Sequence, residues 1–324
     1  MTCFSFLLRR LIRSCPEYMP MTDSPSHRPF SLVLAGGGAR GYAHVGVLRA
    51  LEAEGIRPDA IVGVSMGAVI GVTYALRDDW YAALLDMDTT PFPGPLPTYK
   101  EWNAPLWQRM RAAGTYLRLA FDFTVGWGVG TKALSHGMRT LQKLSQGRNL
   151  EEGRLPVAVC ATDLRTGSRV VFRSGPAAEV AYASAAIAGV LPPQRRGDQL
   201  LVDGVYADIA PVDVARDFAP PLVLAVDPAQ PLAPRQVRNG FQAMLRAVEI
   251  CQMRHADLRF DDADLVLRPP FRRIIDTLDF DARRECVAAG LRAVRQRRDT
   301  LHRLLQPGSD VTVSFPNPNS SSES

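Results

Sequence analysis

The sequence lacks the features that mark a secreted, membrane-spanning or zinc-binding protein. Its 324 residues include only five cysteines, which are scattered and form no Cys-x-x-Cys pair. Neither a disulfide framework nor a metal site is predicted, and a reducing compartment is the simplest interpretation. No apolar run reaches the roughly 18 residues that a spanning helix needs. We therefore expect a cytoplasmic protein, with peripheral contact to the inner membrane face as an open alternative.

Excess charge and histidine are also scarce. Lysine and arginine number 38 against 33 acidic residues, which gives a net charge of +5. This small positive excess does not indicate a nucleic-acid partner. It would suit an anionic membrane surface as well as it would suit a nucleic acid. With five histidines, the usual catalytic base has few candidates.

Proline and serine divide the chain into three parts. Residues 1–28 contain three prolines, with Pro29 directly after them, and are predicted to be irregular. The first 20 or so residues are either a loose amphipathic anchor or sequence upstream of a true start at Met19 or Met21. Residues 29–306 are predicted to form one α/β domain, and 307–324 a disordered tail. Within the domain, 90–130 holds three of the four tryptophans with interleaved arginines. That composition is typical of a lid over an active site or of a surface that contacts lipid. An insertion with its own small core is an equally open alternative.

Apolar runs alternate with helical patterns along the domain. Residues 30–35 and 59–64 are continuous apolar stretches, which is typical of buried parallel strands. Each is followed by a helix, at 42–54 and 65–76, as in right-handed crossovers. Further strands are predicted at 155–164, 168–174, 199–204, 221–228 and 263–269. Further helices are predicted at 176–187, 211–218, 237–260 and 281–306.

A glycine-rich loop joins the first strand to the first helix. It contains Gly36, Gly37, Gly38, Arg40 and Gly41. Glycines at such a junction indicate that something lies very close to the backbone. The string fits a dinucleotide fingerprint, and the same loop would suit a phosphate or an oxyanion.

The second strand ends in a nucleophile-elbow pattern. Gly63-Val-Ser65-Met-Gly67 places a serine on a sharp strand-to-helix turn, where side chains two residues away on either side would collide with backbone. A dinucleotide-binding unit would instead end this strand with Asp or Glu. The preferred interpretation is therefore that the amides of Gly36–Gly38 form an oxyanion hole beside Ser65, with Arg40 adding positive charge. An exposed arginine at a helix start is the simpler alternative for Arg40.

Three blocks in this order, "GGGARG", "GVSMGA" and "LVDG", resemble the patatin-like phospholipase family, and the resemblance runs from about Phe30 to about Pro228. It implies a three-layer α/β/α fold with a mostly parallel central sheet. It also implies acyl-ester hydrolysis of lipids, of phospholipase A or lysophospholipase type, through a Ser65–Asp203 dyad. Phospholipid, lysophospholipid and neutral glyceride all stay open as substrates.

The sequence pattern, apart from the family resemblance, also indicates Asp203 as the candidate general base. It ends an apolar strand and is followed by Gly204, so we expect it at the same C-terminal edge of the sheet as Ser65. A carboxylate is a weak base, and partial desolvation would raise its pKa. A turn-capping aspartate is the alternative role. His255 and His302 follow Asp203 as a conventional triad would require, but both occur in long charged helices. The dyad scheme needs no metal and no cofactor.

Three positions depart from the family's usual pattern. Val205 stands where a smaller residue follows Asp-Gly, Ala188 replaces a proline, and Ile209 replaces an asparagine. These changes bear on the catalytic rate more than on the fold. A second hypothesis is therefore a catalytically weak regulatory or lipid-binding protein.

Overall fold

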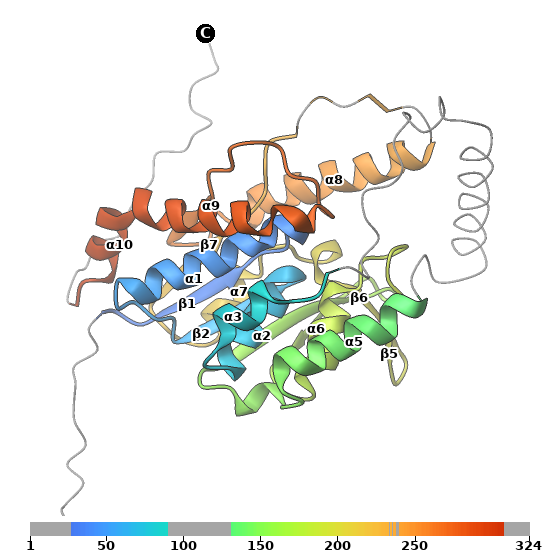
Figure 1. Ribbon diagram of the computed structural model, residues 1–324, viewed down its shortest axis with the longest axis horizontal. Helices are drawn as coiled ribbons and strands as arrows, with labels where there is room; N and C mark the ends of the chain where they lie inside the picture. Colours follow the sequence, from blue (N-terminus) through green and yellow to red (C-terminus); the bar gives the residue numbers. More distant parts are fainter. Residues whose placement is uncertain (1–26, 90–130, 233, 235, 238–239, 308–324) are drawn as a thin grey trace, which may run out of the picture.

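The computed structural model describes residues 27–89, 131–232, 234, 236–237 and 240–307. The predictions for the N-terminal segment up to residue 26, for the 90–130 insertion and for the tail from residue 308 lie outside these ranges. Within them, strands and helices alternate along the chain much as the sequence predicts (Figure 1).

A central sheet of eight strands organises the domain, in the order β5-β6-β3-β2-β1-β7-β8 with β4 paired to β3. The strands are β1 (Phe30–Leu34), β2 (Ala60–Val64), β3 (Val157–Asp163), β4 (Arg169–Phe172), β5 (Gln194–Arg196), β6 (Gln199–Asp203), β7 (Leu222–Val226) and β8 (Leu265–Leu267). The five neighbours from β3 to β8 are parallel. The sheet is therefore mostly parallel, as expected.

Helices cover both faces of the sheet. They are α1 (Ala43–Ala53), α2 (Met66–Leu76), α3 (Trp80–Leu85), α5 (Thr131–Ser145), α6 (Ala177–Ala185), α7 (Val212–Arg216), α8 (Gly240–Arg259), α9 (Arg283–Gln296) and α10 (Arg298–Leu305). Short 3₁₀ helices are η1 (Gly38–Tyr42), η3 (Leu150–Glu152), η4 (Gly204–Tyr206) and η5 (Phe280–Ala282).

Two separate cores result from the alternation of side chains along each strand. Leu32 and Leu34 of β1 belong to the larger core, which includes residues of α1, α2, α6 and α9. Val33 and the following Ala35 belong to the smaller core, which includes residues of α7 and α8. One sheet between two helical layers is the three-layer α/β/α architecture, so the predicted fold class is confirmed.

The direction of β6 differs from the expected arrangement. It runs antiparallel to β3, with Ala161 opposite Asp203, while β2 runs parallel to β3, with Val64 opposite Cys160. β3 continues beyond the end of β2, and β6 pairs with that extension and returns along it. Asp203 therefore meets Ser65 from the opposite strand direction, not from a parallel neighbour at a common edge.

Smaller differences concern element boundaries. The strand β5 was not predicted, because the short polar run of Gln194–Arg196 carries no strand pattern. The helix predicted over 281–306 is divided into η5, α9 and α10, with a break at Arg297. Among the helices of the described ranges, none combines the length and the hydropathy that crossing a membrane requires.

Candidate active site

The turn after β2 holds Ser65 in a conformation that non-glycine residues rarely adopt. Its φ is 55° and its ψ is −125°, a strain that typically costs about 1–3 kcal/mol. A Cβ on Gly67 would overlap the carbonyl of Leu34, and a Cβ on Gly63 would lie 2.5 Å from the Cα of Ala68. Both glycines therefore fit the tight approach of this turn to its neighbours, and Ser65 is the N-cap of helix α2.

Ser65 and Asp203 form a buried hydrogen-bonded pair. The hydroxyl of Ser65 donates to Asp203 Oδ2 at 2.6 Å. Only 5% of Ser65 and 1% of Asp203 are exposed. The other carboxylate oxygen, Oδ1, accepts the N–H of Val205 at 3.0 Å.

Burial sets the protonation behaviour of the aspartate. Removal from water disfavours the carboxylate and raises the pKa of Asp203 to about 7, although the hydrogen bonds from Ser65 and Val205 oppose this shift. A carboxyl group with this pKa can exchange a proton near neutral pH, which is what a general base requires.

The loop that carries Asp203 is fixed by buried polar contacts. Thr162 Oγ1 donates to the carbonyl of Asp203 at 2.9 Å and accepts the N–H of Ala207 at 3.1 Å. The N–H of Asp203 donates to the carbonyl of Ala186 at 2.9 Å. A Cβ on Gly204 would overlap the carbonyl of Cys160. The carboxylate is thus held from the sheet and from the segment after α6.

The glycine loop lies directly beside this pair. A Cβ on Gly36 would be 3.6 Å from Ser65 Cβ, and the side chain of Val205 already fills that space. Gly37 packs against Pro228, and Gly38, with φ of 54°, packs against Thr277. The loop therefore has no room for larger side chains.

The amides of the loop do not all have the same partners. The N–H of Gly36 donates to the carbonyl of Ile209 at 3.3 Å. This amide is therefore already bonded, whereas the sequence predicted that the amides of Gly36, Gly37 and Gly38 all serve an oxyanion beside Ser65. Within the described part of the chain, the amides of Gly37 and Gly38 have no acceptor, and neither has that of Met66 at the start of α2. Sequence reasoning did not single out Met66, although the elbow motif places its amide next to the serine.

Arg40 and Gly41 lie where the glycine loop becomes a helix. A Cβ on Gly41 would lie 2.7 Å from the side chain of Met66, which brings this turn against the start of α2. Burial lowers the pKa of Arg40, and the carboxylates of Glu249, Asp276 and Asp227 oppose that shift. Among the described residues, no hydrogen bond joins Arg40 to the Ser65–Asp203 pair. The contribution of Arg40 to an oxyanion hole stays a prediction.

None of the described histidines, His255 included, forms a hydrogen bond or an ion pair with the Ser65–Asp203 pair. His44 is fully buried, and its Nε2–H donates to the carbonyl of Ala35 at 2.8 Å, so it fastens the end of β1 to α1. Burial lowers its pKa to about 4, which keeps the ring neutral. His302 contacts Glu54 and His136 contacts Asp88. The structure gives Ser65 an aspartate partner and no histidine partner among the described residues.

Each departure from the family pattern makes a local contact. Val205 supplies an N–H to Asp203 and its side chain covers Gly36. Ile209 supplies the carbonyl that binds Gly36. Ala188 has an N–H that proline lacks, and this N–H donates to the hydroxyl of Tyr206 at 3.1 Å.

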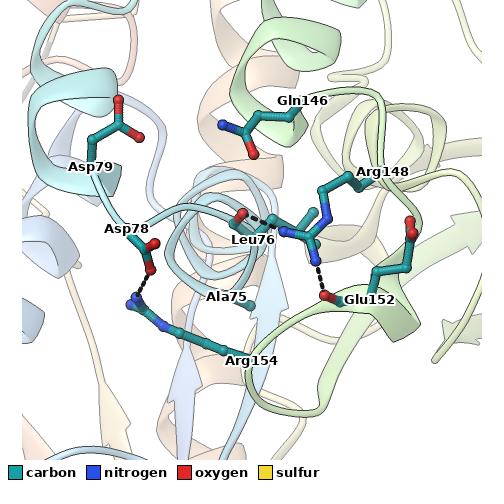
Figure 2. A pocket seen from close by; sticks show the side chains of 8 residues that line it. All are labelled: Ala75, Leu76, Asp78, Asp79, Gln146, Arg148, Glu152 and Arg154. Atoms are coloured by element: carbon teal, nitrogen blue, oxygen red, sulfur yellow. Dashed lines mark hydrogen bonds and ion pairs between the residues drawn. The ribbon is translucent and has the colours of Figure 1, made fainter.

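The pocket shown in Figure 2 lies at the other end of α2. It is lined by Ala75, Leu76, Asp78, Asp79, Gln146, Arg148, Glu152 and Arg154. Its charged side chains bind one another and the last carbonyls of the helix. Since it is far along the helix from Ser65, it is not part of the candidate site.

Fold and site together define an α/β protein with a buried serine–carboxylate pair at a strand-to-helix turn. The sequence model of the patatin-like phospholipase family matches residues 32–216, more than half of the chain. The chain belongs to the patatin-like phospholipase family.

Relatives with curated names agree with this family. A patatin-like phospholipase domain-containing protein of Caenorhabditis elegans is 33% identical over 60% of this chain and 13% of its own length. A lysophospholipase of Saccharomyces cerevisiae is 30% identical over 65% of this chain and 11% of its own. An uncharacterised NTE-family protein of Mycobacterium bovis is 30% identical over 72% of this chain and 59% of its own. The chain thus spans less than two thirds of these relatives.

Proposed function

We propose that the protein is a lipid acyl hydrolase of phospholipase A or lysophospholipase type, with Ser65 as nucleophile and Asp203 as general base. The observation that carries this proposal is the 2.6 Å hydrogen bond from Ser65 Oγ to a buried aspartate whose pKa is raised to about 7. The lysophospholipase named among the relatives supports this class of substrate.

The first half-reaction acylates the serine. Asp203 accepts the proton of Ser65 as Oγ attacks the acyl carbonyl of the lipid. The amides of Gly37, Gly38 and Met66, which have no acceptor among the described residues, hold the oxyanion of the tetrahedral intermediate. The intermediate collapses to an acyl-serine, and the proton on Asp203 passes to the leaving alcohol.

The second half-reaction restores the enzyme. Asp203 takes a proton from water, and the hydroxide attacks the acyl-serine carbonyl. Collapse of the second tetrahedral intermediate releases the fatty acid, and the proton returns to Ser65. The same aspartate serves both halves because each begins with removal of a proton from an attacking hydroxyl.

A fluorophosphonate probe tests the assignment. Covalent labelling of the parent protein and its absence in Ser65→Ala, with hydrolysis of a short p-nitrophenyl ester following the same pattern, is the expected result. Hydrolysis of that ester by Ser65→Ala at the parent rate would refute it. A folded parent that is neither labelled nor active, yet binds lipid vesicles, would favour the lipid-binding alternative. A panel of phospholipid, lysophospholipid and neutral glyceride then assigns the substrate.

A further inference from the structure

Ser184, one residue before the end of α6, has a fully buried hydroxyl with two partners. It accepts the N–H of Ser65 at 2.9 Å and donates to the carbonyl of Cys160 at 2.6 Å. Because this hydroxyl both accepts and donates, the N–H of Ser65 and the carbonyl of Cys160 are each paired. It therefore joins the candidate nucleophile to the neighbouring strand.

The place of this hydroxyl in the sheet explains why it is needed. The pairing of β2 with β3 ends where Val64 lies opposite Cys160. Ser65 then turns out of the sheet, so its N–H and the Cys160 carbonyl cannot continue the ladder. The hydroxyl of Ser184 stands between these two groups and bonds to both. It replaces a ladder hydrogen bond at the point where the turn begins.

The residues just after Ser184 hold the other half of the pair. The carbonyl of Ala186 accepts the N–H of Asp203 at 2.9 Å. The N–H of Ala188 donates at 3.1 Å to the hydroxyl of Tyr206, three residues after Asp203. The carbonyl of Cys160, bound by Ser184, also lies against Gly204. Three residues of the short segment 184–188, namely Ser184, Ala186 and Ala188, thus bind both turns of the site.

We propose that Ser184 is a positioning residue that sets the direction of the Ser65 hydroxyl toward Asp203. It holds the backbone of Ser65 at its unusual φ and ψ, while Ala186 holds Asp203 at a fixed distance along the same segment. Ser184 touches neither the substrate nor the reacting atoms in this scheme. The inference rests on the proposed function, because it assigns to Ser184 the orientation of that nucleophile.

Tyr182 on the same helix provides a matched control. Its hydroxyl is also buried and donates to the carbonyl of Pro192 at 2.8 Å, but it makes no contact with Ser65 or Asp203 among the described residues. Ser184→Ala and Tyr182→Phe each remove one buried hydroxyl from α6. A loss of stability is therefore expected in both, and a loss of catalysis in the first alone.

The test compares kcat, KM and pH profiles for a short soluble ester. Ser184→Ala is expected to lower kcat about 10- to 100-fold with little change in KM, since a displacement of about 1 Å has effects of this size. The hydrogen bond from Ser65 lowers the pKa of Asp203, so its loss should move the rising limb of activity to higher pH. Tyr206, the titratable group that faces Asp203, has its pKa raised to about 12 and stays neutral here. Tyr182→Phe should leave kcat and the limb close to those of the parent.

Ser184→Cys gives the same measurement in case the alanine variant does not fold, because a thiol is only a weak donor and acceptor of similar size. A parent-like kcat and pH profile in a folded Ser184→Ala or Ser184→Cys would overturn the proposal, as would an equal loss in Tyr182→Phe. A crystal structure of Ser184→Ala separates the two proposals. A broken Ser65–Asp203 hydrogen bond supports positioning, and a retained one overturns it. Failure of the proposed function would show differently, as parent-like hydrolysis by Ser65→Ala.

Discussion

The two ends of helix α2 are built on opposite principles. At its C-terminal end, the carbonyl of Leu76 accepts from Arg148 at 2.8 Å (Figure 2). The carbonyl of Arg77, just after the helix, accepts from Arg154 at 3.3 Å. At its N-terminal end, Ser65 is strained and buried, and the amide of Met66 has no acceptor among the described residues. Charged side chains bind carbonyls at the C-terminal end, and the N-terminal end has a backbone amide without an acceptor among the described residues.

The C-terminal end of α2 stabilises the fold, and the N-terminal end carries residues of the proposed reaction. Arginines at a helix C-terminus satisfy the last carbonyls and complement the helix dipole, which stabilises the fold. The amide of Met66 beside the strained Ser65 has no acceptor among the described residues, and the proposed function assigns it to an oxyanion that forms during the reaction. The pocket of Figure 2 and its charged side chains lie at the C-terminal end of α2, so neither feature marks the candidate site.

The largest expected effect concerns the base at the N-terminal end. Asp203→Asn keeps the shape of the side chain but cannot accept the proton of Ser65, so kcat should fall by roughly 10²–10⁴-fold. Steady-state hydrolysis of a soluble ester measures it. His255→Ala and His302→Ala serve as controls and should keep the parent rate. A comparable loss in either, in a folded protein, would return the ordinary triad to consideration.

The next effect concerns the space around the serine turn. Gly67→Ala should destabilise the protein by more than about 3 kcal/mol, because the new methyl group would overlap the carbonyl of Leu34. Gly137→Ala is the control, in helix α5 with its nearest neighbour 3.9 Å away. It should stabilise the helix by about 0.5–1 kcal/mol. Urea unfolding of both variants measures the contrast, and equal stabilities would mean that the turn tolerates a side chain.

A third effect is the cost of the buried carboxylate. The pKa of Asp203 is raised from 3.8 to about 7 in the folded chain. Protonation of Asp203 favours the folded state, and its contribution to the free energy of unfolding is fully present below pH 3.8. The contribution is lost as the pH rises toward 7, by about 4 kcal/mol in all. The unfolding free energy of the parent, relative to that of Asp203→Asn, should therefore fall between pH 4 and pH 8. A pH-independent difference would show that Asp203 is not shifted.

The same titration should appear in catalysis. Only the ionised aspartate can accept the serine proton, so kcat/KM should rise with pH and level off above about 7. A rising limb near pH 4 would mean that the carboxylate is solvated during turnover.

The smallest effect is expected at the C-terminal end of α2. Arg148→Ala removes the hydrogen bond to the carbonyl of Leu76 and should cost about 1 kcal/mol of stability. Its kcat/KM should match the parent's. Lys143→Ala, an exposed neighbour on α5, should change neither quantity. A fall in kcat/KM for Arg148→Ala would show that the two ends of α2 are coupled.

Sequence patterns predicted most of this architecture. Continuous apolar runs identified the parallel strands, and the elbow motif identified the turn that holds Ser65. The direction of β6 was not predictable, because a five-residue strand has the same pattern whichever way it pairs. Its position depends on the extra length of β3, which only the folded sheet reveals.

Buried polar contacts were the other part that the sequence did not reveal. Ser184 and Thr162 each bind backbone near the candidate pair, yet a serine in an alanine-rich helix and a threonine in a strand are ordinary residues there. The family resemblance from about Phe30 to about Pro228 includes Ser184, but none of the three blocks that carry it does. These hydrogen bonds join residues 119 and 41 positions apart, and contacts at such separations leave no periodicity in the sequence.

The antiparallel approach of β6 has a consequence for biosynthesis. Ser65 and Asp203 are 138 residues apart in the chain, and β6 is made long after β2 and β3. A growing chain that has emerged only as far as β3 contains Ser65 but not Asp203. It therefore lacks the residue that the proposed function assigns as general base. Under that proposal, hydrolysis begins only when β6 has joined the sheet.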